Sequence, residues 1–250
     1  LLGKKHGILT NSGSSANLLA AGLFEPGHVI TPVSCFPTTL SPLLFFGYKP
    51  VFVDVELPNL NLNLDQVEIK LKENPKIKYL AFAHTLGVSP DMDHVMDIVK
   101  KHNLIFLEDT CDSLDSKWDG KLLGSFGDVS TCSFYPAHHM TMGEGGFVAT
   151  DNIDCCNRLR KMRDWGRGCI CEGKNANLSP IGTCQKRFSS WLPNYPEIIM
   201  DHKYVFEEMG FNLKPLELQA ALGLEQIKKL PQFTQARKDN YAQMFKIFEP

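Results

Sequence analysis

Short apolar segments rich in β-branched residues alternate with longer helical patterns over the first 150 residues, and this alternation restricts the possible folds most strongly. Strands that are apolar along their whole length need cover on both faces. The pattern therefore predicts an α/β fold, with a mostly parallel, mixed sheet flanked by helices. The expected strands are 7–10, 28–31, 50–55, 77–83, 104–109, 128–134 and 146–150. The expected helices are 14–24, 38–47, 64–73 and 91–102.

After this region the pattern changes. A helix is expected over 151–166, followed by an irregular stretch over 167–201 and by a helical pattern that starts at 215–230 and continues toward the end. An irregular stretch of that length inside a domain is usually functional or disordered. Its aromatic and cysteine residues argue against plain disorder. We therefore expect it to serve a function.

Composition excludes several classes of protein. The 250 residues are 43% hydrophobic and 22% charged, with a net charge of −2, which is typical of a globular protein and gives no support for nucleic-acid or acidic-membrane binding. No apolar run approaches the roughly 20 residues of a transmembrane helix, and no secretion signal is recognisable, so a cytoplasmic location is expected. The chain starts at Leu1, and its last helical pattern runs up to Pro250, so we expect a fragment of a longer protein.

Eight cysteines are many for a cytoplasmic chain. A disulfide framework is the first alternative, but such frameworks belong mainly to small secreted domains. This chain is large enough to bury a core of its own. The cysteines therefore favour metal binding or reactive thiols.

The segment TNSGSSAN, residues 10–17, has the pattern of a strand end, a turn of small residues and a helix start. The backbone amides of Gly13, Ser14 and Ser15 would point out of that helix N-terminus, which is a favourable place for a phosphate group. The alternative is that Ser14 only caps the helix.

The segment LEDTCDSL, residues 107–114, brings Glu108 and Asp109 to the carboxyl end of a strand, where open α/β sheets bind their ligands. A carboxylate there could keep the ring nitrogen of a pyridine cofactor protonated. The alternative for Asp109 is a helix cap.

The segment SFYPAHHMTMGEGG, residues 133–146, contains His138 and His139 but no lysine. Imidazole lacks a primary amine, yet it can accept and donate a proton near neutral pH. A histidine outside any motif is more often a packed or surface residue. Its place beside the other motifs favours a catalytic role for His138.

These motifs together resemble the DegT-type sugar aminotransferase and dehydratase branch of the fold-type-I pyridoxal phosphate enzymes. The resemblance runs from Gly7 to Leu230 and also includes PVFVDVE and GFNLKPLELQAALGLEQIKKL. It implies a large cofactor-binding domain over 1–232 that lacks its N-terminal part. Residues 233–250 would begin a helix leading to a truncated C-terminal small domain. A homodimer is also implied.

The resemblance assigns roles to individual residues. Most of the family has a lysine four residues after the position of Phe134, bonded covalently to the cofactor, and this chain has His138 there. The implied contacts to pyridoxal or pyridoxamine phosphate are Asp109 on the ring nitrogen, Phe36 stacked on the ring, Asp112 beside it, Gly13, Ser14 and Ser133 on the phosphate, and Asn212 on the phosphate of a neighbouring subunit. The alternatives are core packing for Phe36 and a turn for Asn212. Many relatives carry glutamine at the position of Asp112.

Loss of the lysine separates the dehydratases of this branch from its aminotransferases. The resemblance implies that pyridoxamine phosphate condenses with the C4 ketone of a nucleotide-linked 4-keto-6-deoxyhexose. His138 would remove a proton from the cofactor, and the C3 hydroxyl would leave. The product would serve the formation of 3,6-dideoxysugars for lipopolysaccharide O-antigen.

The cysteines bear on which dehydratase this is. Cys111, Cys169 and Cys171 have the spacing C-x57-C-x-C, and Cys184 follows in TCQKRF. This set resembles the ligands of a 2Fe–2S cluster in the dehydratases that act on a CDP-linked sugar and take electrons from an NAD(P)H-dependent iron–sulfur flavoprotein reductase. The gap between Cys171 and Cys184 is longer than in those proteins. Zinc and unligated thiols are the alternatives.

Other functions stay open at this point. They are a redox-neutral GDP-4-keto-6-deoxymannose 3-dehydratase, a nucleotide-sugar aminotransferase, which the absence of the lysine opposes, and an inert cofactor- or metal-binding subunit. Arg163, Arg167, Lys186 and Arg187 could contact nucleotide phosphates or form a solvated rim.

Overall fold

The computed structural model describes residues 1–57, 59–171 and 186–248. Its centre is a seven-stranded sheet with the order β1-β9-β8-β5-β4-β2-β3. Strand β9 runs antiparallel to both of its neighbours, β1 and β8, and every other pair of adjacent strands is parallel. The predicted mostly parallel, mixed sheet is therefore confirmed. The strands are β1 (His6–Thr10), β2 (His28–Pro32), β3 (Lys49–Val53), β4 (Ile77–Ala83), β5 (Ile105–Asp109), β8 (Val129–Ser133) and β9 (Gly146–Thr150).

Helices cover both faces of the sheet, as its apolar strands require. The helices are α1 (Gly13–Ala21), α2 (Pro37–Phe45), α3 (Leu64–Glu73), α4 (Met92–His102), α5 (Ile153–Arg163) and α6 (Glu217–Phe248). Helices α1, α2 and α5 pack on one face, and α3 and α4 pack on the other. The side chains of a strand alternate between these two layers. In β5, for example, Phe106 lies in the α3–α4 layer and Leu107 in the α1–α2–α5 layer.

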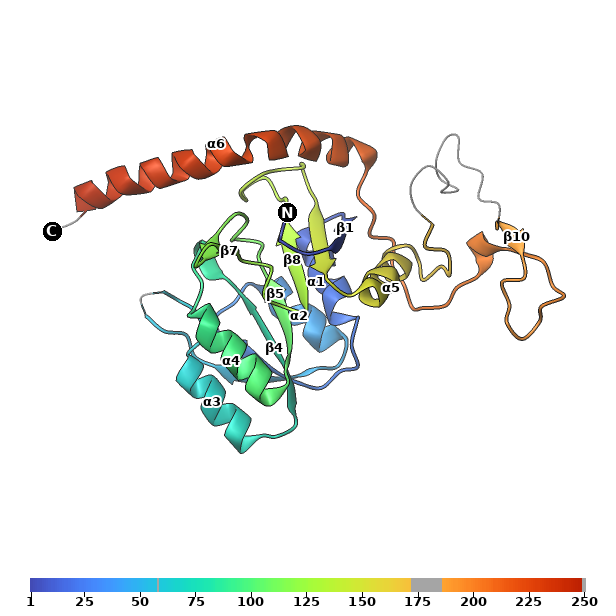
Figure 1. Cartoon of the computed structure of the whole chain (residues 1–250), viewed down its shortest axis with the longest axis horizontal. Coiled ribbons are helices and arrows are strands. Elements are labelled where there is room, and N and C mark those ends of the chain that lie inside the picture. The colour runs from blue at the N-terminus through green and yellow to red at the C-terminus, as the bar shows by residue number, and fades with distance from the viewer. Residues whose placement is uncertain (58, 172–185, 249–250) are drawn as a thin grey trace.

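Helix α6 crosses the end of the molecule at β8 and β9 and then extends well beyond the rest of the fold (Figure 1). Its N-terminal half is held near the sheet: Leu230 is buried with Met140 and Met142, and the side chain of Gln219 donates to the carbonyl of Glu144 at 3.0 Å. The predicted domain boundary at 232/233 falls inside this unbroken helix, and the division into two domains stays a prediction. Large apolar side chains are exposed along its outer part, namely Tyr241, Met244, Phe245, Ile247 and Phe248.

Two small hairpins account for most of the remaining regular structure. Strands β6 (Lys117–Trp118) and β7 (Lys121–Leu122) are joined by two residues with positive φ, Asp119 and Gly120, as a tight hairpin turn requires. Within the predicted irregular stretch, β10 (Phe188–Ser189) pairs with β11 (Met200–Asp201), and Arg187 contacts Asp201 at 2.8 Å. Short 3-10 helices cover Thr85–Gly87 and His202–Tyr204. Among the described helices, none is long and apolar enough to span a membrane.

Candidate active site

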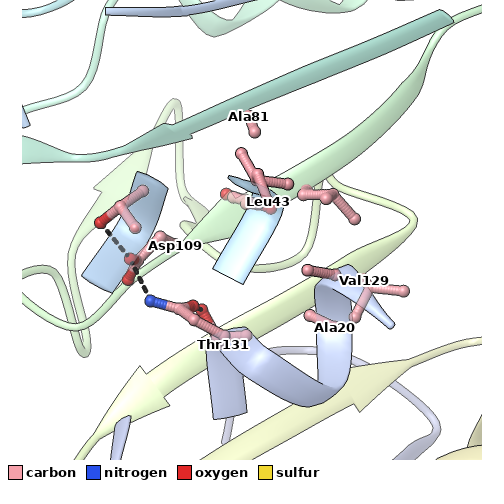
Figure 2. A pocket seen from close by; sticks show the side chains of 11 residues that line it. Ala20, Leu43, Ala81, Asp109, Val129 and Thr131 are labelled. Atoms are coloured by element: carbon pink, nitrogen blue, oxygen red, sulfur yellow. Dashed lines mark hydrogen bonds between the residues drawn. The ribbon is translucent and has the colours of Figure 1, made fainter. Parts of the chain in front are cut away.

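Asp109 lies at the carboxyl end of β5, where its buried carboxylate is held by three hydrogen bonds. The side chains of Asn17 on α1 and Thr39 on α2 each donate to Oδ2 at 2.8 Å, and the backbone amide of Cys111 donates to Oδ1 at 3.0 Å. Figure 2 shows the two side-chain bonds meeting at Asp109, beside a small internal cavity of about 20 Å³. The carboxylate is therefore fixed in one orientation. This arrangement excludes a role limited to capping a following helix.

Glu108, the preceding residue, turns to the opposite face of the sheet. Its carboxylate accepts backbone N–H groups from Gly124, Phe126 and Gly127 at 2.6, 3.0 and 2.7 Å, and it contacts Nε2 of buried His84 at 3.0 Å. Burial alone raises the pKa of Glu108. The contact with His84 and the backbone hydrogen bonds outweigh this effect and hold the pKa below its ordinary value. The carboxylates of Glu108 and Asp109 therefore lie on opposite faces of the sheet.

The face of Asp109 opens into a cavity of about 580 Å³ at the carboxyl ends of the parallel strands. This is where open α/β sheets bind ligands, and the volume lies in the range typical of small-molecule sites. Six of the residues proposed from the sequence to contact a cofactor line it together with Asp109. They are Gly13, Ser14, Phe36, Asp112, Ser133 and His138.

His138 follows β8 in a turn closed by the bond from its own amide to the carbonyl of Tyr135 at 2.9 Å. Its Nε2 lies 3.5 Å from Oδ1 of Asp112, and its ring meets the ring of Tyr135 edge-on at a centroid distance of 5.7 Å. Its Nδ1 is buried without a hydrogen-bond partner in the part of the chain that the structure describes. The ring is therefore positioned by Asp112 and Tyr135. His139, the next residue, does not line this cavity.

Gly13 begins α1 and passes very close to β8. A Cβ atom at Gly13 would lie 2.5 Å from Cβ of Ser133 and 3.2 Å from Sγ of Cys111, so only glycine fits. Ser12, not Ser14, is the N-cap, because its hydroxyl accepts the amide of Ser15 at 3.1 Å. The exposed hydroxyl of Ser14 donates to Thr38 instead. The N-terminus of α1 therefore faces the cavity, and the hydroxyl of Ser14 is not the helix cap.

Phe36 and Asn212, two further residues predicted to contact the cofactor, lie in different surroundings. Phe36 is 68% exposed and lines the cavity, which opposes the alternative of core packing. Asn212 is exposed and forms an antiparallel bridge with Asp164. It is not among the residues lining the cavity, so its predicted contact across a subunit interface stays a prediction.

The cavity has the features that a pyridine ring with a phosphate arm requires. Asp109 offers a fixed carboxylate for a ring nitrogen, and the helix N-terminus at Gly13 offers a cradle that a larger residue would fill. Oδ1 of Asn11, which also lines the cavity, is buried and unpartnered among the described residues. These groups fit pyridoxal or pyridoxamine phosphate.

The four proposed cluster ligands are only partly described. Cys111 lines the cavity, whereas Cys169 and Cys171 lie beyond the end of α5, and Cys184 lies outside the described residues. Within the described ranges, no three His, Cys, Asp or Glu side chains form a group that could hold a metal. Burial, and then the nearby carboxylate of Asp109, raise the pKa of Cys111 well above its ordinary value. Metal binding there would require loss of the thiol proton. The cluster stays a prediction.

Two of the four basic residues singled out from the sequence contact carboxylates in the described part of the chain. Arg163 contacts Asp164 at 3.1 Å, and Arg187 contacts Asp201. Arg167 lies over the ring of Trp165 at 4.5 Å. These contacts favour the solvated-rim interpretation for Arg187, whereas Arg163 is largely buried and also donates to the carbonyl of Leu9 at 3.1 Å.

Sequence reasoning missed the two residues that orient Asp109. Asn17 on α1 and Thr39 on α2 are buried polar side chains among apolar core residues, and both are less than a tenth exposed. A buried polar group must be hydrogen-bonded, so a polar residue on a core-facing helix position is the signal that could have found them. Tyr135 and Glu144 were also missed as lining residues.

Comparison with known proteins identifies the family of the chain. Residues 1–249 match the model of the DegT/DnrJ/EryC1/StrS aminotransferase family. The chain is 41% identical over 252 residues to the lipopolysaccharide biosynthesis protein RfbH of Salmonella typhimurium, covering 96% of this chain and 56% of that protein. It is 42% identical over 253 residues to the dTDP-4-dehydro-2,6-dideoxy-D-glucose 3-dehydratase of Saccharopolyspora spinosa, covering 97% and 53%. The chain thus spans about half the length of these relatives.

A solved structure resembles the whole described fold. It is the E. coli GDP-4-keto-6-deoxy-D-mannose-3-dehydratase with bound hydrated pyridoxal phosphate, with a TM-score of 0.83 and 27% identity over 99% of this chain and 62% of that one. The fold predicted from the resemblance is confirmed. The chain belongs to the DegT/DnrJ/EryC1/StrS aminotransferase family.

Proposed function

We propose that this chain forms the cofactor-binding part of a pyridoxamine phosphate-dependent 3-dehydratase that acts on a nucleotide-linked 4-keto-6-deoxyhexose. The observation that carries the proposal is an imidazole, His138, in the same cavity as the fixed carboxylate of Asp109. Among the described residues, no lysine lines that cavity. Relatives at 41 and 42% identity are named for lipopolysaccharide biosynthesis and for sugar 3-dehydration, which supports the same activity.

Each residue of the cavity would have one task. Asp109 would hold a proton on the pyridine nitrogen, and Phe36 would cover one face of the ring. Gly13, Ser14 and Ser133 would bind the phosphate at the N-terminus of α1, where backbone N–H groups favour an anion. When bound, pyridoxamine phosphate supplies an amine for the sugar ketone and a ring that withdraws electrons.

His138 would move the proton that the elimination requires. Because Nδ1 is buried, Nε2 is the nitrogen that we assign to this transfer, and Asp112 at 3.5 Å would hold its orientation. His138 would accept this proton at Nε2 beside the bound cofactor, whose electron-withdrawing ring would allow the C3 hydroxyl of the sugar to leave. A lysine at this place would instead bond covalently to the cofactor.

The test replaces His138. In protein loaded with pyridoxamine phosphate, His138→Ala should lower the rate of dehydration by about 10²- to 10⁴-fold, the usual contribution of a proton-transferring group. His138→Lys should convert the bound aldehyde form of the cofactor into a covalent adduct, detected by mass spectrometry after borohydride reduction. Native turnover by His138→Ala, or a covalent adduct in the resting wild-type protein, would contradict the proposal.

The finer proposal adds a 2Fe–2S cluster on Cys111, Cys169, Cys171 and Cys184. Its support is the cysteine spacing and the place of Cys111 in the cofactor cavity. Such a cluster would allow one-electron transfer from a flavoprotein reductase. Iron and labile sulfide should be present in the purified protein and lost in Cys169→Ser but not in Cys155→Ser. A colourless protein that turns over with glutamate alone would instead support the redox-neutral dehydratase.

The nucleotide is part of the same proposal. CDP-linked substrate is favoured by the cluster ligands, whereas relatives are named for dTDP- and GDP-linked sugars. Assays with CDP-, dTDP- and GDP-linked 4-keto sugars should give the highest kcat/KM for the CDP form. Amine transfer to the sugar would indicate an aminotransferase, and binding of cofactor without turnover would indicate an inert subunit. We also propose a homodimer, which light scattering would test.

A further inference from the structure

The amide of Asn17, which holds Asp109, has its own orientation set by three contacts. Its Nδ2 donates to Oδ2 of Asp109 at 2.8 Å and to the backbone carbonyl of Thr38 at 3.1 Å. Its Oδ1 accepts the hydroxyl of Thr131 at 2.5 Å. Both groups on the Nδ2 side are acceptors, so an amide turned over would bring oxygen against oxygen at two places. The NH₂ group must therefore face Asp109.

The carbonyl of Thr38 has a particular need for this amide. In a regular helix it would accept the N–H group of the residue four positions on, but that residue is Pro42, which has no N–H group. The Nδ2 of Asn17 supplies a donor instead. Thr38 lies in the first turn of α2, two residues after Phe36, the N-cap. One amide therefore joins the carboxylate proposed for the ring nitrogen to the turn that carries the residue proposed for the ring face.

Thr131 is the far end of this chain of hydrogen bonds. It is buried on β8 and borders the small internal cavity beside Asp109 (Figure 2), and it is not among the described residues that line the cofactor cavity. Its backbone carbonyl accepts both the amide and the hydroxyl of Thr110, at 2.8 and 2.6 Å, which fixes its place next to the end of β5. An amide oxygen cannot donate, so the hydroxyl of Thr131 is the donor to Asn17.

We propose that Thr131 is a positioning residue of the reaction, which holds the amide of Asn17 with its NH₂ group toward Asp109 and so keeps that carboxylate aimed at the cofactor ring nitrogen. The proposal rests on the proposed function, because it concerns the cofactor assigned to this site. Hydrogen bonds in a buried chain polarise one another, so a donor at one end strengthens the bond at the other. Without the Thr131 hydroxyl, the oxygen of the amide loses the donor that fixes it, and the bond to Asp109 weakens.

The first measurement is the protonation of the bound cofactor, and it requires no turnover. Protein is loaded with pyridoxamine phosphate that carries ¹⁵N in its ring, and the nitrogen resonance is followed as the pH rises. An aligned carboxylate favours the protonated ring. The ring should therefore lose its proton about one pH unit lower in Thr131→Val than in wild type, as expected when a hydrogen bond to a charged group is weakened. Thr131→Ser keeps the hydroxyl and should restore the wild-type midpoint.

Thr150→Val is the matched control. Thr150 is a buried threonine of the neighbouring strand β9, and its hydroxyl donates to the carbonyl of Asp128 at 2.8 Å. Both substitutions remove one hydroxyl donor from the sheet, so both should lower the urea midpoint of unfolding. Only Thr131→Val should move the titration of the ring nitrogen. An equal shift in both variants would show a general effect of lower stability and overturn the proposal.

A double variant tests whether the effect passes through Asn17. Asn17→Ala should shift the titration of the ring nitrogen at least as far as Thr131→Val does. Adding Thr131→Val to Asn17→Ala should bring no further shift, because the intermediate side chain is already gone. A further shift as large as that of Thr131→Val alone would show another route and overturn the proposal. If Asn17→Ala does not fold, the contrast between valine and serine at position 131 decides the question.

The second measurement is kinetic, and it separates this proposal from the proposed function. With a 4-keto sugar nucleotide, Thr131→Val should lower kcat by about tenfold with little change in KM, since the residue acts on the cofactor and not on the sugar. A shifted nitrogen titration in a protein that dehydrates no sugar would remove the proposed function and leave the positioning role. A wild-type titration in Thr131→Val would overturn the positioning role, whatever the activity.

Discussion

Glu108 and Asp109 are consecutive acidic residues of one strand, yet their surroundings have little in common. Glu108 accepts three backbone amides and contacts His84 on the α3–α4 face. Asp109 accepts two side-chain donors on the α1–α2 face and borders a cavity of about 580 Å³. The strand alternation that separates them also separates their roles. One carboxylate holds a turn together, and the other is positioned toward a ligand.

The largest effect on activity should come from a substitution of Asp109, the carboxylate that borders the cofactor cavity. Asp109→Asn keeps the size of the side chain but removes the charge that would keep the pyridine nitrogen protonated. We expect dehydration to fall by about 10²- to 10⁴-fold while the fold survives. Stopped-flow or steady-state rates give the first result, and circular dichroism gives the second. Near-native turnover by this variant would contradict the proposed role of Asp109 in the reaction.

Glu108→Gln should do the opposite, with little direct effect on chemistry and a large loss of stability. Glutamine keeps one carbonyl oxygen but turns an NH₂ group toward part of the donor set, which comprises the amides of Gly124, Phe126 and Gly127 and the ring of His84. Each buried donor left without an acceptor costs about 1–3 kcal/mol. Urea unfolding would measure it, and Glu225→Gln on the exposed part of α6 is the control, with no expected change. Unchanged stability in Glu108→Gln would show that the turn does not depend on this carboxylate.

The same residue makes stability depend on pH in a defined direction. The pKa of Glu108 in the folded protein is held below its ordinary value of 4.5, so the unfolded chain binds its proton more readily. Its stabilisation is therefore fully present above pH 4.5 and is lost as the pH falls through the folded pKa. Unfolding free energies measured between about pH 6 and pH 3 should fall less steeply in Glu108→Gln than in wild type. Parallel curves would contradict the assignment.

Gly13→Ala tests the close approach of α1 to β8 at the end of the cavity where we propose that the phosphate binds. The added methyl group would lie 2.5 Å from Cβ of Ser133, so α1 and β8 must separate at a cost of about 1–3 kcal/mol. We expect weaker binding of pyridoxamine phosphate, measured by fluorescence titration. Adding Ser133→Gly removes the clashing atom and should restore stability. If the double variant is no more stable than Gly13→Ala, the clash is not the cause.

Phe36→Ala should have the smallest effect on the fold. The side chain is 68% exposed, so stability should change by less than about 0.5 kcal/mol. Loss of its contact with the cofactor ring should weaken cofactor binding by about 0.5–1.5 kcal/mol. Phe45 is equally exposed but does not line the cofactor cavity, which makes Phe45→Ala a matched control that should leave cofactor affinity unchanged. Equal cofactor affinities in the two variants would remove Phe36 from the site.

The strand and helix pattern could be predicted well from the sequence because apolar periodicity dominates this fold. Strands β4 and β9 and helix α3 have the predicted bounds, and other elements differ by a few residues at their ends. Helix α1 begins one residue earlier than expected, because Ser12 and not Ser14 is the cap. A local pattern such as SGSS offers several possible caps, and tertiary contacts of Gly13 with Ser133 decide among them.

Part of the site could also be predicted from the sequence. Residues at or just after the ends of strands, such as Asp109 and His138, could be found because the carboxyl ends of parallel strands converge. Asn17 and Thr39 could not be paired with Asp109 from their spacing, since these bonds join residues 92 and 70 positions apart. The cavity that Lys117, Arg237 and Lys238 line between the segment after β5 and α6 was also missed. It depends on the path of α6, which no local pattern specifies.

Helix α6 has a mechanical consequence. Near its start it is tied to the turn that carries His138, because Gln219 bonds to Glu144 and Gly223 lies against Met142. Further along the helix, Thr234 bonds to Asp115 and Arg237 bonds to the carbonyl of His139. The helix is therefore held against the site over about five turns, and only the part beyond Arg237, about 15 Å of the described helix, extends without these contacts. A partner bound to the exposed apolar side chains of that end would act on the site through Thr234 and Arg237.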